Sequence, residues 1–305
     1  MKKELRAGKN ISSQNSLRFS RRKELVAVLL IFPAVLSLLL FKYVPIMLGV
    51  FETFFKMDIV NLPGKFIGLD NYARAFHDKQ FLEAFFHNVK LFCYTLVMNF
   101  WVPIALAMLI NETRRGRTFF RLVYFIPACT PMIAMTILWK YFWQPDYGLA
   151  NYLMTCLNLP PQLWLNSEKL VYFCIAFPNL VISGGMNMVI YLAALQDVPN
   201  ELYEAALIDG AGIKKRMRYV TLPCIKHIIV LMLTLSVINS FNTMENILIL
   251  TGGGPANSTQ TMLLYAYQQA VNSMDYSYAI TMITIVFAVT MTLTVVFNKI
   301  TSNKD

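Results

Sequence analysis

The chain has 305 residues, of which 56% are hydrophobic and only 14% are charged, and its formal net charge is +10. A chain this apolar and this sparsely charged is not an ordinary soluble enzyme; its composition is that of a membrane protein. The basic residues are divided among several loops instead of being gathered on one face, which argues against a nucleic-acid-binding protein.

Six segments are apolar and have the length of a bilayer span, roughly 17 to 25 residues. They cover residues 25–41, 91–110, 122–139, 170–195, 228–250 and 276–297. Most contain no charged residue, and Glu245 is the only acid well inside one of them. The sequence therefore predicts an all-α, polytopic membrane protein with six transmembrane helices.

Basic residues close to span ends mark the loops that stay in the cytoplasm. Here they lie before the first predicted span and in the second-to-third and fourth-to-fifth connections, whereas residues 251–275 contain no Lys or Arg. This alternation places both termini in the cytoplasm. The basic, polar segment 1–20 is expected to be mobile, and residues 21–305 are expected to form one six-span domain in a bacterial cytoplasmic membrane.

Some local features are expected along these spans. A short outer helix is predicted around residues 71–87, and residues 252–255, three glycines and a proline, predict a turn. Prolines inside or beside spans should bend the helices, because proline removes a backbone donor. Bent helices often line substrate paths, although simple packing kinks would leave the same signature. These prolines are Pro33, Pro45, Pro103, Pro127, Pro131 and Pro178.

A polar, charged loop, residues 197–223, connects the fourth and fifth predicted spans. Asp197 and Pro199 suit a helix start, so a helix is expected over residues 199–209, ended by Gly210. A second, basic helix is expected over residues 213–219, with the next span beginning at Leu222 and Pro223. On the first helix Leu202, Ala205 and Ala206 fall on one stripe, beside Tyr203 and Leu207, and present an apolar surface.

The same loop contains a spaced motif: Glu204-Ala205-Ala206, three residues, Gly210, nine residues, Val220, one residue and Leu222-Pro223. It resembles the cytoplasmic loop by which permease subunits of bacterial ABC importers contact their ATPase. The resemblance implies the ABC type I importer permease fold and a set of ATPase-coupling residues: Tyr203, Glu204, Ala205, Ala206, Asp209, Gly210, Gly212, Leu222 and Pro223. From periodicity alone, a loop lying on the anionic inner leaflet would fit as well.

Further stretches, residues 66–72, 116–121 and 250–255, resemble the sugar-importing branch of these permeases. The resemblance implies import of a sugar or oligosaccharide together with a second homologous permease, two ATPase subunits and an extracytoplasmic solute-binding protein. The sequence has no Gly-x-x-x-x-Gly-Lys-Ser/Thr motif, so ATP is expected to be used by the partner subunits, with no cofactor in this chain and no enzymatic activity of its own.

Polar side chains in the fourth and fifth predicted spans are costly in lipid unless they meet partners or line a cavity. Amides and hydroxyls suit a neutral sugar, although hydrogen bonding between helices would explain each residue equally well. The resemblance ranks Asn179 first and places Ser240 and Thr243 at pocket positions of the maltose permease subunit. The substrate-path candidates are Asn179, Ser183, Ser240, Asn242, Thr243 and Glu245.

Other functions fit less well. An importer of glycerol phosphate or another anionic solute would call for basic residues within the spans, and these are scarce. An ion-coupled secondary transporter would need membrane carboxylates beyond Glu245. The three histidines and five cysteines show no metal-ligand spacing, so no metal site is predicted.

Overall fold

The computed structural model describes residues 26–57, 64–113 and 116–302. The predicted mobile segment 1–20, and with it most of the basic residues that orient the first span, lies outside these ranges. The chain separates into two compact units, residues 1–68 and residues 69–305. Each unit is described by itself.

The first unit holds a long apolar helix and a small hairpin. The helix Val26–Glu52 is long and apolar enough to cross a membrane; it contains a π-helical turn, η1 (Leu39–Tyr43), followed by α2 (Val44–Glu52). Strands β1 (Phe55–Lys56) and β2 (Lys65–Phe66) pair antiparallel. Residues 26–41 of the first predicted span, 25–41, therefore belong to a longer helix.

The second unit is helical throughout its regular elements. Three of its helices are candidate spans without a break: α4 (Lys79–Glu112), α8 (Val171–Gln196) and α15 (Tyr276–Ser302). Two more candidates are bent pairs, so the described part of the chain has four continuous candidate spans, or up to six if each bent pair is one span. The all-α class is confirmed. The remaining span elements are α5 (Arg117–Phe125), η2 (Ile126–Cys129), α6 (Met132–Phe142), α10 (Ile213–Arg216), η4 (Met217–Thr221), α11 (Leu222–Cys224) and α12 (Lys226–Phe241).

Both bends follow prolines. The first pair is bent by 98° across residues 130 and 131, and Pro131, inside this break, is the N-cap of α6, so the predicted kink at the third span is confirmed. The second pair is bent by 71° at Ile225, two residues after Pro223. The prediction that Leu222 and Pro223 begin the next span is wrong: α11 continues the loop helix, and α12 begins only at Lys226.

The predicted span 228–250 is not one helix. Helix α12 ends at Phe241, residues 242 and 243 are non-helical, and α13 (Met244–Leu250) starts a new helix. The Asn242 N–H donates to the Asn239 carbonyl at 3.0 Å, the tightened turn common at helix ends. We call residues 241–245, from the last residue of α12 to the second residue of α13, the α12–α13 break.

The expected outer helix over residues 71–87 is also two helices, α3 (Asp70–His77) and the start of α4. The reason is the side chain of Asp78, which caps α4: its Oδ1 accepts the N–H of Gln80 at 2.9 Å and that of Phe81 at 3.3 Å. This satisfies donors that the first helical turn leaves unpaired.

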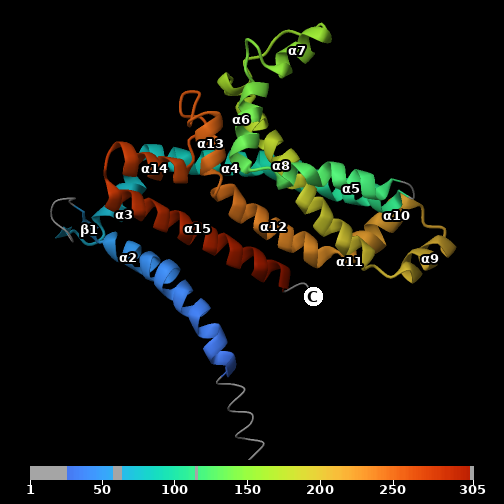
Figure 1. Cartoon of the computed structure of the whole chain (residues 1–305), viewed down its shortest axis with the longest axis horizontal. Coiled ribbons are helices and arrows are strands. Elements are labelled where there is room, and N and C mark those ends of the chain that lie inside the picture. The colour runs from blue at the N-terminus through green and yellow to red at the C-terminus, as the bar shows by residue number, and fades with distance from the viewer. Residues whose placement is uncertain (1–25, 58–63, 114–115, 303–305) are drawn as a thin grey trace, which may run out of the picture. The chain divides into compact units, whose positions relative to one another are not determined.

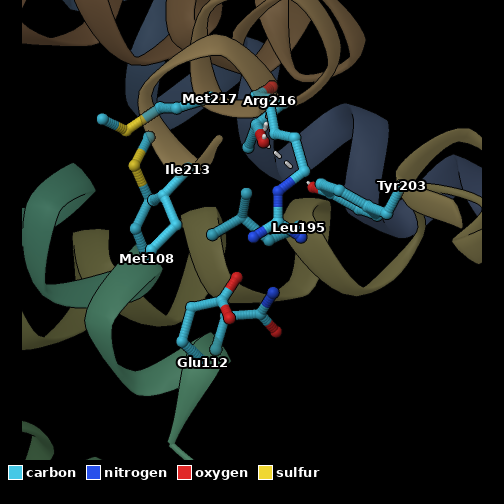
Figure 2. Close-up of a pocket in the computed structure, with 9 residues that line it drawn as sticks. Met108, Glu112, Leu195, Tyr203, Ile213, Arg216 and Met217 are labelled. Atoms are coloured by element: carbon cyan, nitrogen blue, oxygen red, sulfur yellow. Dashed lines mark hydrogen bonds between the residues drawn. The ribbon is translucent and has the colours of Figure 1, made fainter. Parts of the chain in front are cut away.

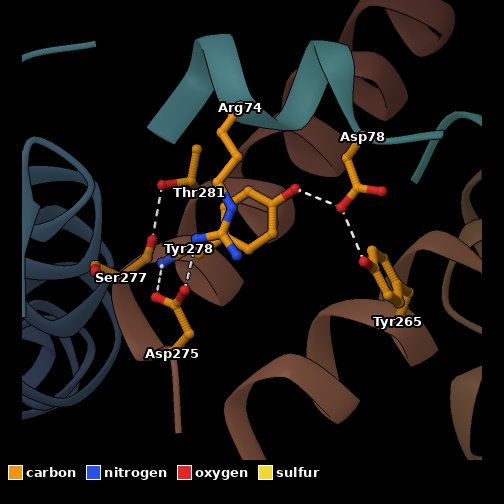
Figure 3. A network of polar contacts seen from close by, with 7 residues as sticks. All are labelled: Arg74, Asp78, Tyr265, Asp275, Ser277, Tyr278 and Thr281. Atoms are coloured by element: carbon orange, nitrogen blue, oxygen red, sulfur yellow. Dashed lines mark hydrogen bonds and ion pairs between the residues drawn. The ribbon is translucent and has the colours of Figure 1, made fainter. Parts of the chain in front are cut away.

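Asp78 also ties three helices together (Figure 3). Its Oδ2 accepts the hydroxyls of Tyr265, on α14 (Met262–Asn272), and of Tyr278, on α15, each at 2.8 Å. Arg74 lies 3.7 Å from the centre of the Tyr278 ring and pairs with Asp275 at 2.6 Å. This end of the unit is therefore joined by polar contacts around one carboxylate.

A glycine allows α5 to lie directly against α8, the two helices that run side by side in Figure 1. A Cβ atom built on Gly185 would lie 1.8 Å from the Tyr124 carbonyl oxygen, whereas on the neighbouring Gly184 it would lie 3.4 Å from its nearest contact, Leu180. Only the first position excludes a side chain.

Two loops complete the unit. The predicted turn at residues 252–255 is present, with Gly252 and Gly253 at positive φ of 62° and 100°. Between α6 and α8 lie α7 (Leu149–Cys156) and a 3-10 turn, η3 (Trp164–Asn166), joined because Asn151 Oδ1 accepts the indole N–H of Trp164 at 2.7 Å.

Candidate functional site

The loop after α8 is a helix, a sharp turn and a second helix. Helix α9 (Asn200–Ile208) closely matches the prediction, with Pro199 as its N-cap. Gly210 has a φ of 71°, its N–H donates to the Leu207 carbonyl at 3.0 Å, and the Ala211 N–H donates to the Ala206 carbonyl at 2.8 Å. This is a Schellman ending, in which glycine avoids the cost of a left-handed residue. Figure 1 shows the loop at the opposite end of the unit from α3 and α14.

The outward side of α9 is exposed and largely apolar. Leu202 and Ala205 are exposed, as the stripe predicted, but Ala206 is half-buried. Ile208, which the sequence analysis missed, is 87% exposed. Its position three residues after Ala205 continues the same stripe, so helical spacing would have found it. Glu204, Asp209 and Gly210 are exposed beside this stripe.

Tyr203 faces the opposite way and fastens α9 to the second half of the loop. Its hydroxyl lies 3.1 Å from Oγ1 of Thr221, which is buried at the end of η4. The second predicted helix begins at Ile213, and its helical structure runs on as α10, η4 and α11 to Cys224. Gly212 is the extended N-cap of α10, a conformation open to any residue.

A cavity of 60 Å³ lies between this loop and the ends of α4 and α8 (Figure 2). Arg216 points into it, and its buried Nε has no hydrogen-bond partner among the described residues. Glu112, at the last residue of α4, lies on the far side of the cavity from Arg216. The lining residues are Met108, Asn111, Glu112, Leu195, Tyr203, Ile213, Arg216, Met217 and Thr221.

Arg117 closes the end of α4 beside this cavity. Its Nε donates to the Ile110 carbonyl at 3.2 Å, and its Nη2 donates to Oδ1 of Asn111 at 3.1 Å and to the Asn111 carbonyl. These bonds satisfy carbonyls that a helix end otherwise leaves free. The end of α4 that the loop meets is thus held firmly.

Among the polar span residues, Asn179 is buried in a chain of hydrogen bonds that crosses three helices. Thr136 of α6 donates to Oδ1 of Asn246 on α13 at 2.9 Å, and Asn246 Nδ2 donates to Oδ1 of Asn179 on α8, also at 2.9 Å. Thr136 and Asn246 were missed from the sequence, although Asn246 stands directly after Glu245 within a predicted span.

The other candidates divide into two groups. Ser240 is buried and its hydroxyl donates to its own helix, at the Val237 carbonyl, 2.7 Å away. Asn242 and Glu245 are exposed and Thr243 is half-buried, so three of the candidates gather at the α12–α13 break. Ser183 is exposed on α8, away from these bonds.

No metal centre emerges from residues 26–57, 64–113 and 116–302: they contain no group of three or more His, Cys, Asp or Glu side chains placed to hold an ion.

A bundle of continuous and bent apolar helices with an exposed loop of this form is the architecture of a membrane transport permease. Residues 101–304 match the family described as "Binding-protein-dependent transport system inner membrane component". The chain belongs to this family, and it is a multi-pass membrane protein of the transport class.

Several permeases are similar over nearly their whole length. The sulfoquinovosyl glycerol transport system permease protein SmoG of Agrobacterium fabrum is 32% identical over 92% of both chains. The trehalose/maltose transport system permease protein MalF of Thermococcus litoralis is 30% identical over 92% of this chain and 94% of its own. The arabinooligosaccharides transport system permease protein AraP of Bacillus subtilis is 35% identical over 86% of this chain and 84% of its own.

The fold is that of a solved importer. A chain of a bacterial ABC transporter involved in the import of the acidic polysaccharide alginate superposes with a TM-score of 0.83 at 23% identity, covering 94% of this chain and 98% of its own. The predicted ABC importer permease fold is confirmed.

Proposed function

We propose that this chain is one of two permease subunits of an ATP-driven importer of a neutral sugar or oligosaccharide. The observation that carries the proposal is the loop of residues 197–223, which presents an exposed apolar helix, ended at Gly210, to a partner. A membrane transport permease without a nucleotide-binding motif needs such a surface to dock the separate ATPase subunits whose ATP hydrolysis drives transport. The other partners are a homologous second permease and an extracytoplasmic solute-binding protein, with both termini in the cytoplasm.

The chemistry of the α12–α13 break supports a neutral sugar. Amide and hydroxyl groups match sugar hydroxyls, and Asn242 and Thr243 supply both kinds. The charged side chain exposed there is an acid, Glu245, which repels anionic solutes such as glycerol phosphate. A carboxylate in an apolar span is costly against lipid, so Glu245 faces a watery path or a partner. Two of the similar permeases are named for trehalose, maltose or arabinooligosaccharides.

The contacts of the loop suggest how ATP binding is coupled to movement of the spans. Closure of the ATPases on binding ATP moves α9, and the contact between Tyr203 and Thr221 passes the movement to η4. The 71° bend at Ile225 then transfers it to α12, which leads to the α12–α13 break. ATP and the loaded binding protein favour the outward-open arrangement only if each binds that arrangement more tightly than the inward-open one.

The first test is co-purification from gently solubilised native membranes. The wild-type chain is expected to recover an ATPase and a second permease, and the double variant Glu204→Ala with Gly210→Pro is expected to lose the ATPase but keep the permease. Glu201→Ala is the matched control, because it removes an exposed carboxylate from the same helix outside the motif. Recovery of the wild-type chain without an ATPase would reject the proposal and favour an autonomous transporter centred on Glu245.

The substrate class is tested separately by uptake in cells that carry the complete transporter. Radiolabelled maltose, trehalose and arabinooligosaccharides are compared with glycerol phosphate and alginate oligosaccharides. Uptake confined to neutral sugars is expected, and Glu245→Gln should raise any anionic uptake. Transport of the anionic compounds alone by the wild type would overturn the neutral-sugar assignment while leaving the permease assignment intact.

A further inference from the structure

We propose that Asn88 is a positioning residue of the transport path, which holds the α12–α13 break in the geometry that presents Asn242 and Glu245. The proposal rests on the proposed function in one respect only, that the break belongs to the path. Asn88 lies on α4 and does not touch the path itself.

The Asn88 side chain is 1% exposed and spans two other elements. Its Nδ2 donates to the Ser240 carbonyl on α12 at 3.2 Å, and its Oδ1 accepts the backbone N–H of Met262, at the start of α14, at 2.9 Å. One amide therefore joins α4, α12 and α14 through backbone groups. Bonds to backbone groups do not depend on a partner side chain.

The Ser240 carbonyl is the group that decides whether the helix continues. In an unbroken α-helix it would accept the N–H of Met244, four residues on. Here it accepts Nδ2 of Asn88 and, at 3.1 Å, the Thr243 hydroxyl. A buried carbonyl is costly without a donor, so these two donors remove the penalty of ending α12 at this point.

The far side of the break is held independently. Helix α13 is tied to α8 and α6 through Asn246, and α14 is capped by Thr261, whose Oγ1 accepts the Leu264 N–H at 3.4 Å. The break is thus fixed on its α12 side by Asn88 and on its α13 side by Asn246. Discontinuous spans held in this way recur at the substrate sites of transporters.

The position requires a group that donates and accepts at the same time, which an amide does. Aspartate keeps the acceptor for Met262 but places a second oxygen against the Ser240 carbonyl, and leucine loses both bonds. If Asn88 acted only by capping α14, Asn88→Asp would behave as the wild type does. If it acts on the break, both Asn88→Asp and Asn88→Leu disturb it.

The test measures the break directly, in the complete transporter carrying Asn242→Cys in a background with the native cysteines replaced. The readout is the rate at which a membrane-impermeant maleimide labels residue 242. We expect Asn88→Leu and Asn88→Asp each to change this rate by about threefold or more, the effect of losing one net hydrogen bond. Thr95→Val is the control, because within the described part of the chain the Thr95 hydroxyl bonds only to carbonyls of its own helix, those of Leu91 and Phe92.

Uptake is then measured with the same Asn88 variants, but with Asn242 retained. Both variants should lower the maximal rate of uptake and alter the preference between short and long neutral sugars, while co-purification of the ATPase stays unchanged. A wild-type labelling rate in Asn88→Asp overturns the proposal, whatever the uptake shows. Failure of every sugar in the wild type counts against the proposed function and leaves the labelling test valid.

Discussion

Asn246 on α13 donates its amide Nδ2 to Oδ1 of Asn179 on α8 at 2.9 Å, and both side chains are buried. Asn179 was the first substrate-path candidate from sequence, and the structure pairs it with a residue that sequence reasoning missed. The bond joins a continuous span to the short helix beyond the α12–α13 break. Any sugar that binds Asn179 must share it with, or take it from, Asn246.

A double-mutant cycle measures that bond. Asn179→Leu and Asn246→Leu each leave a buried amide without its partner and should destabilise the purified protein by about 1–3 kcal/mol. The double variant should cost less than the sum, because it removes both polar groups. Thermal unfolding in detergent gives all three values. If the destabilisation of the double variant equals the sum of the two single values, the hydrogen bond between the two amides does not stabilise the fold.

The glycine pair on α8 gives a second prediction. Gly185→Ala should destabilise the protein by about 1–3 kcal/mol or prevent its assembly, because the new methyl meets the Tyr124 carbonyl. Gly184→Ala, one residue away, should be neutral or stabilising, since alanine favours a helix by roughly 1 kcal/mol over glycine. Melting temperatures of the two variants test this, and equal values would contradict the close contact between α5 and α8.

The bond between Tyr203 and Thr221 predicts a coupling defect. Tyr203→Phe should keep the ATPase bound, because it leaves the outward face of α9 unchanged, but should lower the amount of sugar imported per ATP hydrolysed. Tyr219→Phe is the control, being an exposed tyrosine on the same loop. Parallel assays of uptake and hydrolysis in proteoliposomes give the ratio. An unchanged ratio in Tyr203→Phe would rule out this route for the movement.

Asp78 predicts a pH dependence of stability. Burial raises the pKa of its carboxyl, but the hydrogen bonds from Tyr278, Tyr265 and the N–H groups of Phe81 and Gln80 outweigh burial, so the pKa lies below the ordinary 3.8. Its contribution to stability is therefore complete above that ordinary value and is lost as pH falls through the lowered pKa of the folded state. Burial and the bond to Asp78 raise the pKa of Tyr265 to about 12, so the tyrosine remains a donor throughout.

The expected outcome is that Asp78→Asn melts below the wild type at pH 7, and that the difference shrinks once the pH falls below about 4. Melting curves of both proteins between pH 7 and 3 provide the measurement, with Glu83→Gln, an exposed acid in the next turn of α4, as the control. A difference that persists unchanged at the lowest pH would mean that the charge of Asp78 does not matter.

The sequence by itself determined the class and the loop. Lipid offers backbone N–H and C=O groups no hydrogen-bond partners, so an apolar run of bilayer length is expected to form a helix, which satisfies these groups internally. The all-α class therefore followed from composition. The coupling helix followed from local chemistry, with Pro199 at its start and Gly210 at its end, and its boundaries agree closely with α9. Local signals suffice where a helix end is set by its own residues.

Only the tertiary structure decided where the fifth predicted span breaks and what its polar residues contact. Nothing in residues 228–250 excludes a continuous helix; α12 ends where it does with its Ser240 carbonyl bonded to Asn88, a residue 152 positions earlier in the chain. In the same way the partner of Asn179 is set by the packing of α13 against α8. A hydrogen bond between distant segments depends on the fold that brings them together, so the local pattern of apolar and polar residues does not predict it.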